Sequence, residues 1–186
     1  MEKVKDFGTS SQYGGDNQNI KLSVPIQQLK AEHEPLLKQV QGIYDLVVEL
    51  QQNCLVDQNW NKKYYQLYKS VVSFLSELKP HTYREDHFLY PLLNRYLQDD
   101  SGMIMVMDYE HKNAKRSIRQ FIETVENRTH PLSPIEALSL LSCLEVAYFT
   151  IVEHFRKEEA VIFPLAEQNL SEEDKETLLL QLKTFG

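Results

Sequence analysis

The chain has 186 residues, 42% hydrophobic and 25% charged, a composition typical of one globular domain. Its net charge of −7 argues against a nucleic-acid or anionic-membrane surface, so neither partner is expected. The two cysteines, Cys54 and Cys143, lack CxxC spacing and indicate neither a disulfide framework nor a thiolate metal site. The N-terminus has no apolar signal region, and no run reaches the roughly 20 uninterrupted apolar residues of a membrane span. We therefore expect a soluble, cytoplasmic protein.

Residues 1–22 are rich in Gly, Ser, Asn and Gln and show no apolar period, which predicts a disordered tail. From Ser23 onward, apolar residues recur at three- and four-residue steps, and no segment alternates as a strand does. Residues 23–186 are therefore expected to form one all-α domain.

Four long helices are predicted in chain order. They cover about residues 23–52, 60–97 with a kink at Pro80, 103–127, and a stretch from Ser133 through Leu165. The fourth opens on SPIE, where Ser133 caps the helix and Glu136 completes a capping box. A further cap at Ser171 predicts a short C-terminal helix. Long helices joined by short loops predict an up-down-up-down four-helix bundle.

Four of the six histidines lie on the apolar stripes, one on each long helix: His33, His81, His111 and His154. Glu85 and Glu158 each follow a histidine by four residues, about 40° around the same helix face, so both point inward. The acids one residue further on, Asp86 and Glu159, are turned about 140° from those histidines. We expect these two acids to face the solvent or the rim.

The chain contains one pattern twice, as HTYREDHFLYPL at residues 81–92 and HFRKEEAVIFPL at 154–165. Each half of the chain supplies a Glu-His pair on one helix and an HxxxE motif on the next. Counting helical rise from the predicted turns places the four histidines at similar heights, within boundary error. The repeat predicts a two-fold metal site.

Four imidazoles and two carboxylates suit two divalent first-row metal ions, with Glu85 and Glu158 able to bridge them. Six protein ligands leave an open position for a small molecule. The expected walls are apolar, which favours a diatomic gas or peroxide over a large polar substrate. These walls are Leu29, Leu37, Leu78, Met107 and Ile151.

Further residues are candidates for the surroundings of the ligands: Glu32, Glu110, Glu159, Met107 and Lys115. Glu32 and Glu110 could orient ligand histidines, and ordinary helix-surface charge is an equally good interpretation. Lys115 is interpreted as solvated or near the entrance, and Met107 as core. His87 and His130 are interpreted as surface residues without a role.

The motifs EHEPLL, HTYREDHFLYPLL, MDYEHKNAKR and HFRKEEAVIFPLAE together resemble the four helix motifs of the hemerythrin-like, or HHE cation-binding, family over about residues 23–170. The resemblance implies a four-helix bundle with a non-haem di-iron centre. It assigns the irons to His33, His81, Glu85, His111, His154 and Glu158.

Two differences from oxygen-carrying members argue against reversible oxygen carriage. Those proteins have a second histidine one turn after the third-helix ligand, where this chain has Lys115, and a bridging Asp where it has Glu159. The paired HxxxE motifs are more similar to the branch that repairs iron-sulfur centres after stress. Repair proteins commonly add a cysteine-bearing N-terminal module and an extra histidine on the first helix, and residues 1–22 contain no cysteine.

Three hypotheses follow from the sequence. The first is a non-haem di-iron protein that binds or senses oxygen, nitric oxide or peroxide. The second is a stress-response protein that donates iron to damaged iron-sulfur proteins. The third is a metal-free helical interaction module. Whether the chain is an enzyme stays open.

Overall fold

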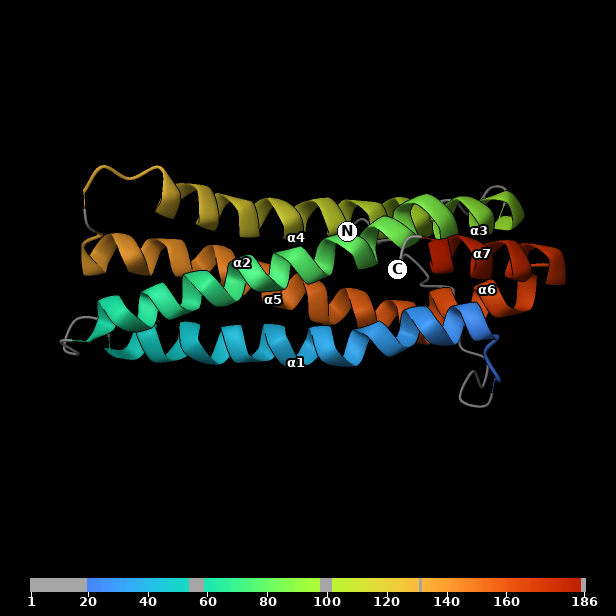
Figure 1. Ribbon diagram of the computed structural model, residues 1–186, viewed down its shortest axis with the longest axis horizontal. Coiled ribbons are helices and arrows are strands. Elements are labelled where there is room, and N and C mark those ends of the chain that lie inside the picture. Colours follow the sequence, from blue (N-terminus) through green and yellow to red (C-terminus); the bar gives the residue numbers. More distant parts are fainter. Residues whose placement is uncertain (1–19, 54–58, 98–101, 131, 185–186) are drawn as a thin grey trace, which may run out of the picture.

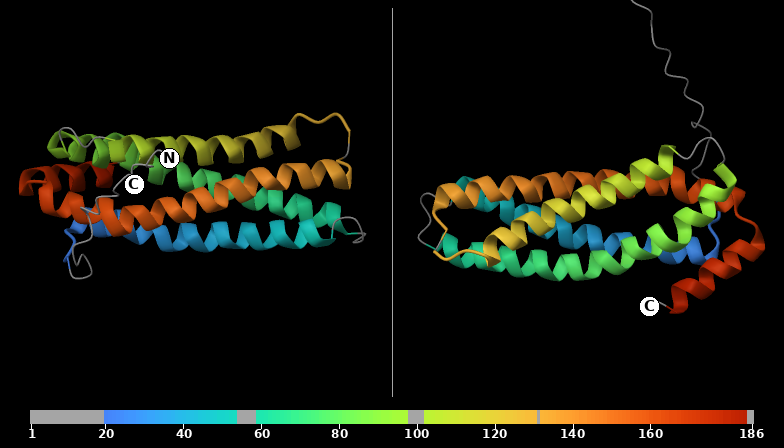
Figure 2. Two further views of the ribbon diagram at one scale, coloured as in Figure 1. Left: turned by 180° about the vertical axis from the view of Figure 1, so that it is seen from behind. Right: turned by 90° about the horizontal axis from the view of Figure 1, so that it is seen from above.

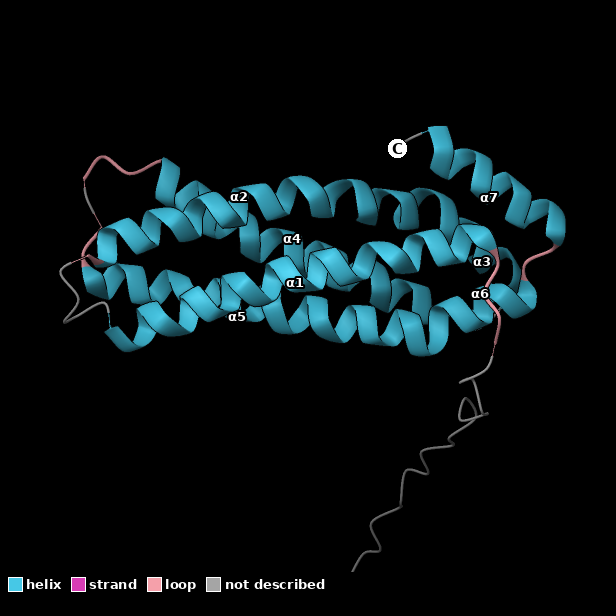
Figure 3. Cartoon of the chain, turned by 60° about the horizontal axis from the view of Figure 1, so that its bottom comes forward, coloured by secondary structure: helices cyan, strands magenta, loops and turns pink. Residues whose placement is uncertain are grey.

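A computed structural model describes residues 20–53, 59–97, 102–130 and 132–184. These residues form helices and loops and contain no strand, as Figure 3 shows. The predicted all-α class is confirmed. The tail predicted over residues 1–22 falls almost wholly outside the described residues, so the division of the chain near residue 22 stays a prediction.

Four long helical elements lie side by side along the molecule (Figure 1). Their bounds are α1 Val24–Asn53; α2 Trp60–Arg84 with the π-helical segment η2 Glu85–Leu89 and α3 Tyr90–Leu97; α4 Gly102–Glu126; and α5 Pro134–Lys157 with the π-helical segment η4 Glu158–Ile162 and α6 Phe163–Asn169. A last helix, α7 Glu172–Thr184, turns away from the bundle axis at one end, as seen from above in Figure 2.

The long elements form a closed ring of neighbours. α1 contacts α2, α2 contacts α4, α4 contacts α5, and α5 contacts α1. Consecutive elements run in opposite directions, as the sequence colours along the ribbons show (Figure 1). The predicted up-down-up-down bundle with a short extra C-terminal helix is confirmed.

Both predicted helix caps are present. The Ser133 hydroxyl accepts a hydrogen bond from the Glu136 backbone N–H, and the Glu136 carboxylate accepts one from the Ser133 backbone N–H, which together make a capping box. At the start of α7, the Asp174 backbone N–H donates to the Ser171 hydroxyl at 3.1 Å. Local sequence therefore fixes where these two helices begin.

Two five-residue π-helical segments interrupt the second and fourth elements at equivalent places. In η2 the backbone N–H of Tyr90 donates to the carbonyl of Glu85, and in η4 that of Phe163 donates to the carbonyl of Glu158. Helix α2 continues through Pro80, where the kink stays a prediction, and the helix becomes π-helical at Glu85. π-helical turns inside α-helices are frequent at functional sites.

The apolar core consists of two clusters of buried residues that follow one another along the bundle. One cluster includes Leu36, Leu78 and Ala114 and extends toward the α1–α2 and α4–α5 connections. The other includes Leu29 and Met107 together with residues of α3, α6 and α7. Along α1 and α4, the nearest members of the two clusters lie about two turns apart, with a histidine between them.

One helical run among the described residues, Pro134–Asn169, is long and apolar enough on average to cross a membrane, with a mean hydropathy of 1.7 in its best window. Polar residues interrupt this run, so it did not meet the expectation of about 20 uninterrupted apolar residues used in the sequence analysis. That window ends before His154 and Glu158, and 28% of it is buried inside the structure. Helices that pack in a protein core satisfy the same length and composition.

Candidate metal centre

The six predicted ligand side chains lie together between the two apolar clusters. The four elements of the bundle each contribute one histidine, and η2 and η4 contribute the glutamates. All six are buried, with exposed fractions from 0% to 3%. They are His33, His81, Glu85, His111, His154 and Glu158. This burial follows from the sequence, because each histidine lies on the apolar stripe of its helix.

Glu85 lies between histidines of three different helices. Its Oε1 is 3.2 Å from Nε2 of His81 and 3.9 Å from Nε2 of His33. Its Oε2 is 3.4 Å from Nε2 of His111. The two oxygens of Glu85 therefore face opposite halves of the bundle, as a bridging carboxylate requires.

Glu158 occupies the equivalent place in the other half but is engaged differently. Its Oε2 is 3.3 Å from Nε2 of His33 and 3.4 Å from Nε2 of His154. Its Oε1 accepts a hydrogen bond of 2.6 Å from the hydroxyl of Tyr90. Only one oxygen of Glu158 is therefore directed at the histidines.

Seven polar atoms at this place are buried and make no hydrogen bond. They are Nε2 of His33, His81, His111 and His154, both carboxylate oxygens of Glu85, and Oε2 of Glu158. Leaving so many buried polar atoms unpaired is costly, because such groups nearly always find a partner in folded proteins. Imidazole nitrogens and carboxylate oxygens are the ligands that first-row divalent metals accept, so the donor set fits such ions.

The ligand atoms form two overlapping groups that could each hold one ion, the atoms within a group lying no more than 4.8 Å apart. The first group is His33, His81, Glu85 and Glu158; the second is Glu85, His111 and His154. Glu85 belongs to both groups. Glu158, which was also expected to be able to bridge, belongs to the first group only, and the number of ions stays a prediction.

Each of the four histidines directs its other ring nitrogen, Nδ1, at a carboxylate from a neighbouring helix. The Nδ1 to oxygen distances are 3.0 Å for His33 and Glu159, 2.8 Å for His81 and Glu32, 2.7 Å for His111 and Asp86, and 3.2 Å for His154 and Glu110. A carboxylate at Nδ1 accepts a hydrogen bond from the N–H of that nitrogen, which leaves the lone pair on Nε2 for a metal.

The four carboxylates in turn each contact a basic side chain. The pairs are Lys30 with Glu159 at 3.0 Å, Arg84 with Glu32 at 2.5 Å, Lys115 with Asp86 at 3.3 Å, and Lys157 with Glu110. Burial alone would raise the pKa of Glu32, but the contacts with His81 and Arg84 outweigh it and lower that pKa. The same balance of burial against histidine and lysine contacts lowers the pKa of Asp86, Glu110 and Glu159. All four carboxylates are therefore held in the ionised form.

Two of the histidines have strongly raised pKa values in the metal-free chain. Burial would lower the pKa of His33, but the adjacent carboxylates of Glu158 and Glu85 raise it to about 10. Burial would likewise lower the pKa of His111, but the carboxylates of Asp86 and Glu85 raise it to about 9. Burial acting alone would raise the pKa of Glu85, yet the surrounding histidines lower it well below its usual range. Without metal, the carboxylates favour protonated, positively charged imidazoles at His33 and His111.

The structure adds a contact to each of two acids that were expected at the rim. Asp86 and Glu159 lie at the rim as expected, with side chains 19% and 34% exposed, but their carboxylates reach histidines on adjacent helices. The predicted angle of about 140° is the angle between each acid and the histidine of its own helix, calculated for an ideal α-helix. Each acid instead lies within a π-helical segment and contacts the neighbouring helix. Asp86 was not among the predicted residues of the site.

Tyr90 was also missed by the sequence analysis. Its side chain is 3% exposed, and its ring stacks on that of His111 with centroids 5.8 Å apart. Burial and the charges of Glu158 and Glu85 raise its pKa well above the usual value, so the hydroxyl stays protonated and donates to Glu158. The internal repeat could have indicated this residue. Tyr90 lies nine residues after His81, and Phe163 lies nine residues after His154.

The remaining candidates occupy places of different kinds. Met107 is 1% exposed and belongs to the apolar cluster beside the centre. Lys115 reaches Asp86 and so contacts the outer part of the site. His87 is exposed and stacks on Tyr83 outside the bundle, and His130 lies in the exposed connection after α4, both as expected.

Two surface pockets flank the first turns of α4, near the centre. One has a volume of about 390 Å³ and is lined mainly by apolar residues, with Met107, Lys157 and Ile162 on the side of the site. The other has a volume of about 510 Å³, and its lining includes Asp86 and Tyr90, which contact ligand residues directly. A small molecule in the second pocket lies next to groups that touch the centre.

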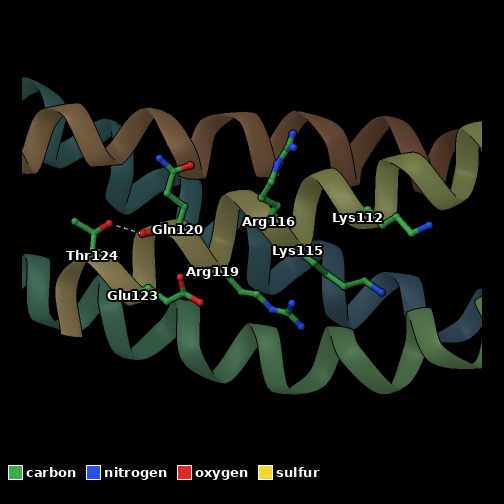
Figure 4. Close-up of a pocket in the computed structure, with 7 residues that line it drawn as sticks. All are labelled: Lys112, Lys115, Arg116, Arg119, Gln120, Glu123 and Thr124. Atoms are coloured by element: carbon green, nitrogen blue, oxygen red, sulfur yellow. Dashed lines mark hydrogen bonds between the residues drawn. The ribbon is translucent and has the colours of Figure 1, made fainter. Parts of the chain in front are cut away.

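A third groove, of about 520 Å³, runs along the outside of α4 and does not reach the ligands. Figure 4 shows that its lining side chains all come from this one helix, among them Lys112, Lys115, Arg116 and Arg119. Lys115 is the residue that connects this basic strip with the centre, through Asp86.

Comparison with known proteins supports the same assignment. The family model for the hemerythrin HHE cation-binding domain matches residues 24–166. Proteins named iron-sulfur cluster repair protein YtfE are similar to this chain, at 29% identity over 100 residues in Yersinia pseudotuberculosis serotype IB (strain PB1/+) and 28% over 100 residues in Yersinia pestis (strain Pestoides F). Each match covers 50% of this chain and 43% of the relative. The family match spans the whole bundle, and the chain belongs to the hemerythrin HHE cation-binding domain family.

Proposed function

We propose that this chain is a non-haem di-iron protein that binds or senses oxygen, nitric oxide or peroxide. The observation that carries the proposal is the set of seven buried, unpaired imidazole and carboxylate atoms that face one another. His33, His81, Glu85, His111, His154 and Glu158 would hold the ions. Iron bound there would supply redox chemistry and affinity for diatomic ligands. We place this activity in the cytoplasm.

The protein's own residues prepare this site in two ways. The outer carboxylates accept a hydrogen bond from Nδ1 of each imidazole, which directs Nε2 toward the ions once a metal has displaced any proton there. Side chains above and below the polar layer exclude water, because Leu29, Leu78, Met107 and Ile151 are all buried. An apolar wall favours a small uncharged molecule over a large polar substrate.

Metal analysis of protein purified without oxygen tests the proposal. We expect about two irons per chain and a spectrum that changes on exposure to nitric oxide or oxygen. His81→Ala should lower the iron content, whereas His87→Ala, which removes an exposed histidine outside the cluster, should not. An iron-free protein that keeps its structure would support the metal-free interaction module instead.

A second function is favoured by the relatives named as iron-sulfur cluster repair proteins. In this alternative the chain donates iron to damaged iron-sulfur proteins. The iron-loaded protein should restore the activity of a damaged iron-sulfur enzyme faster than an equal amount of free ferrous iron. Equal recovery in both reactions would remove this alternative and leave the sensing role intact.

A further inference from the structure

One aromatic position of the internal repeat carries a hydroxyl in only one half of the centre. Tyr90 and Phe163 both lie nine residues after the histidine of their HxxxE motif. The ring of Tyr90 stacks on His111 with centroids 5.8 Å apart, and the ring of Phe163 stacks on His33 with centroids 5.3 Å apart. The aromatic rings therefore occupy equivalent places, and only one of them carries a hydroxyl.

This hydroxyl divides the two bridging carboxylates into unequal ligands. Tyr90 donates to Oε1 of Glu158, which leaves that residue a single unpaired oxygen, whereas both oxygens of Glu85 are unpaired. The remaining oxygen of Glu158 lies 3.3 Å from Nε2 of His33 and 3.4 Å from Nε2 of His154, and it joins the group around His33. The group around His111 contains no atom of Glu158 and has three potential ligands instead of four.

We propose that Tyr90 is a positioning residue that makes the two metal positions unequal and leaves the one at His111 and His154 open to a small exogenous ligand. This inference rests on the proposed function, since it needs two bound ions. The pocket of about 510 Å³ lies on the same side, with Asp86 and Tyr90 in its lining. Figure 1 shows α3, which begins with Tyr90, alongside the start of α4, which carries His111.

Three variants test the inference, with Co²⁺ as a spectroscopic probe in competition with a chelator. Wild-type protein should bind two Co²⁺ in two steps of different affinity. Tyr90→Phe frees the second oxygen of Glu158 and should bring the two dissociation constants closer by about tenfold. Phe163→Tyr supplies an equivalent hydroxyl for Glu85 and should also bring them closer, because each carboxylate then keeps one free oxygen.

The double variant Tyr90→Phe with Phe163→Tyr distinguishes positioning from general damage. It carries one hydroxyl again, in the other half, so the difference between the two steps should return. Adding His111→Ala to wild-type protein should remove the weaker step, and adding it to the double variant should remove the tighter one. Damage to the fold would instead accumulate in the double variant, which melting temperatures would reveal.

Azide binding to the Co²⁺-loaded proteins gives a second readout. Azide should bind wild-type protein and bind Tyr90→Phe about tenfold more weakly, because an oxygen of Glu158 then competes for the open position. If wild-type protein binds no metal, the proposed function fails. If it binds two ions but all variants keep its ratio of dissociation constants and its azide affinity, the role of Tyr90 is wrong and the proposed function stands.

Discussion

At the scale of single residues, the centre is built from one unit repeated four times around the bundle. In each unit a base contacts a carboxylate, the carboxylate accepts from Nδ1 of a histidine, and Nε2 of that histidine faces the interior. The carboxylate comes from the preceding element of the ring, as when Glu32 of α1 contacts His81 of α2 and Glu159 of η4 contacts His33 of α1. Charges in each unit offset one another, so buried ligands are oriented without unpaired charge at the rim.

Removing one of these carboxylates should weaken metal binding without unfolding the protein. Glu32→Gln loses the charge that holds the proton of His81 on Nδ1, and we expect a loss of metal affinity of about tenfold or more. Competition between the protein and a chromogenic chelator for Zn²⁺ measures the affinity. Glu34→Gln is the matched control, because Glu34 is an exposed neighbour on the same helix. Equal affinity of the two variants would contradict the orienting role of Glu32.

Metal uptake should release protons and strengthen as the pH rises. In the metal-free protein, carboxylates raise the pKa of His33 to about 10 and that of His111 to about 9, so both rings carry a proton near neutral pH. A metal must displace these protons, and apparent affinity should therefore increase between about pH 6 and pH 9. Calorimetric titration with Zn²⁺ in two buffers of different ionisation enthalpy counts the released protons. Binding that is independent of pH would show that the rings are already neutral.

At the scale of elements, the two π-helical segments determine which side chains enter the centre. Each begins at a ligand glutamate and places the next acid beside the neighbouring helix. A π-helical turn admits one extra residue per hydrogen-bonded turn, so successive side chains are re-aimed relative to an ideal α-helix. Glu85 faces the interior, as its α-helical spacing from His81 predicts, and Asp86 within the π-helical turn reaches His111.

Helix α7 closes the end of the bundle that contains α3 and α6. Leu178 is fully buried against the apolar cluster, and Leu180 on the same helix is 66% exposed. Leu178→Ala should lower the free energy of unfolding by about 2–5 kcal/mol, because it leaves a cavity in the core. Leu180→Ala should change it by about 0.5 kcal/mol or less. Urea denaturation of both variants measures the difference, and equal stability would show that α7 does not pack in solution.

At the scale of the whole molecule, a polar layer lies between two apolar clusters. The clusters alone would favour an uninterrupted apolar core, and the layer adds seven unpaired polar atoms to the interior. Such a layer destabilises the chain unless an ion satisfies it, since unpaired buried polar groups are costly. Metal binding and stability should therefore be coupled.

Chelation should lower the melting temperature of the metal-loaded protein. An ion at 100 times its dissociation constant stabilises the folded state by about 2.7 kcal/mol, and removing it loses that contribution. Circular dichroism during heating, with and without a strong chelator, measures the change. Chelation should lower the melting temperature of His87→Ala as much as that of wild-type protein, because His87 lies outside the cluster. A melting temperature that chelation leaves unchanged would favour the metal-free interaction module.

Much of this arrangement could be predicted from helical periodicity. An apolar stripe with a three- and four-residue period fixes which face of a helix is buried, and a histidine on that stripe is carried into the core with it. His33 and His154 could therefore be placed inside the bundle before any contact between their helices was known. The caps at Ser133 and Ser171 were equally predictable, because they depend on residues within one turn.

Contacts between helices at the rim could not be predicted in this way. Asp86 reaches His111 because a π-helical segment and the neighbouring α4 bring them together, and no local pattern contains both. The bond from Tyr90 to Glu158 joins residues 68 positions apart. Sequence by itself determined the helices, their buried faces and the ligand types, because these follow from side chains repeated along one helix. Only the tertiary structure decided which acid orients which histidine and which carboxylate oxygen stays free, because those depend on how neighbouring helices meet.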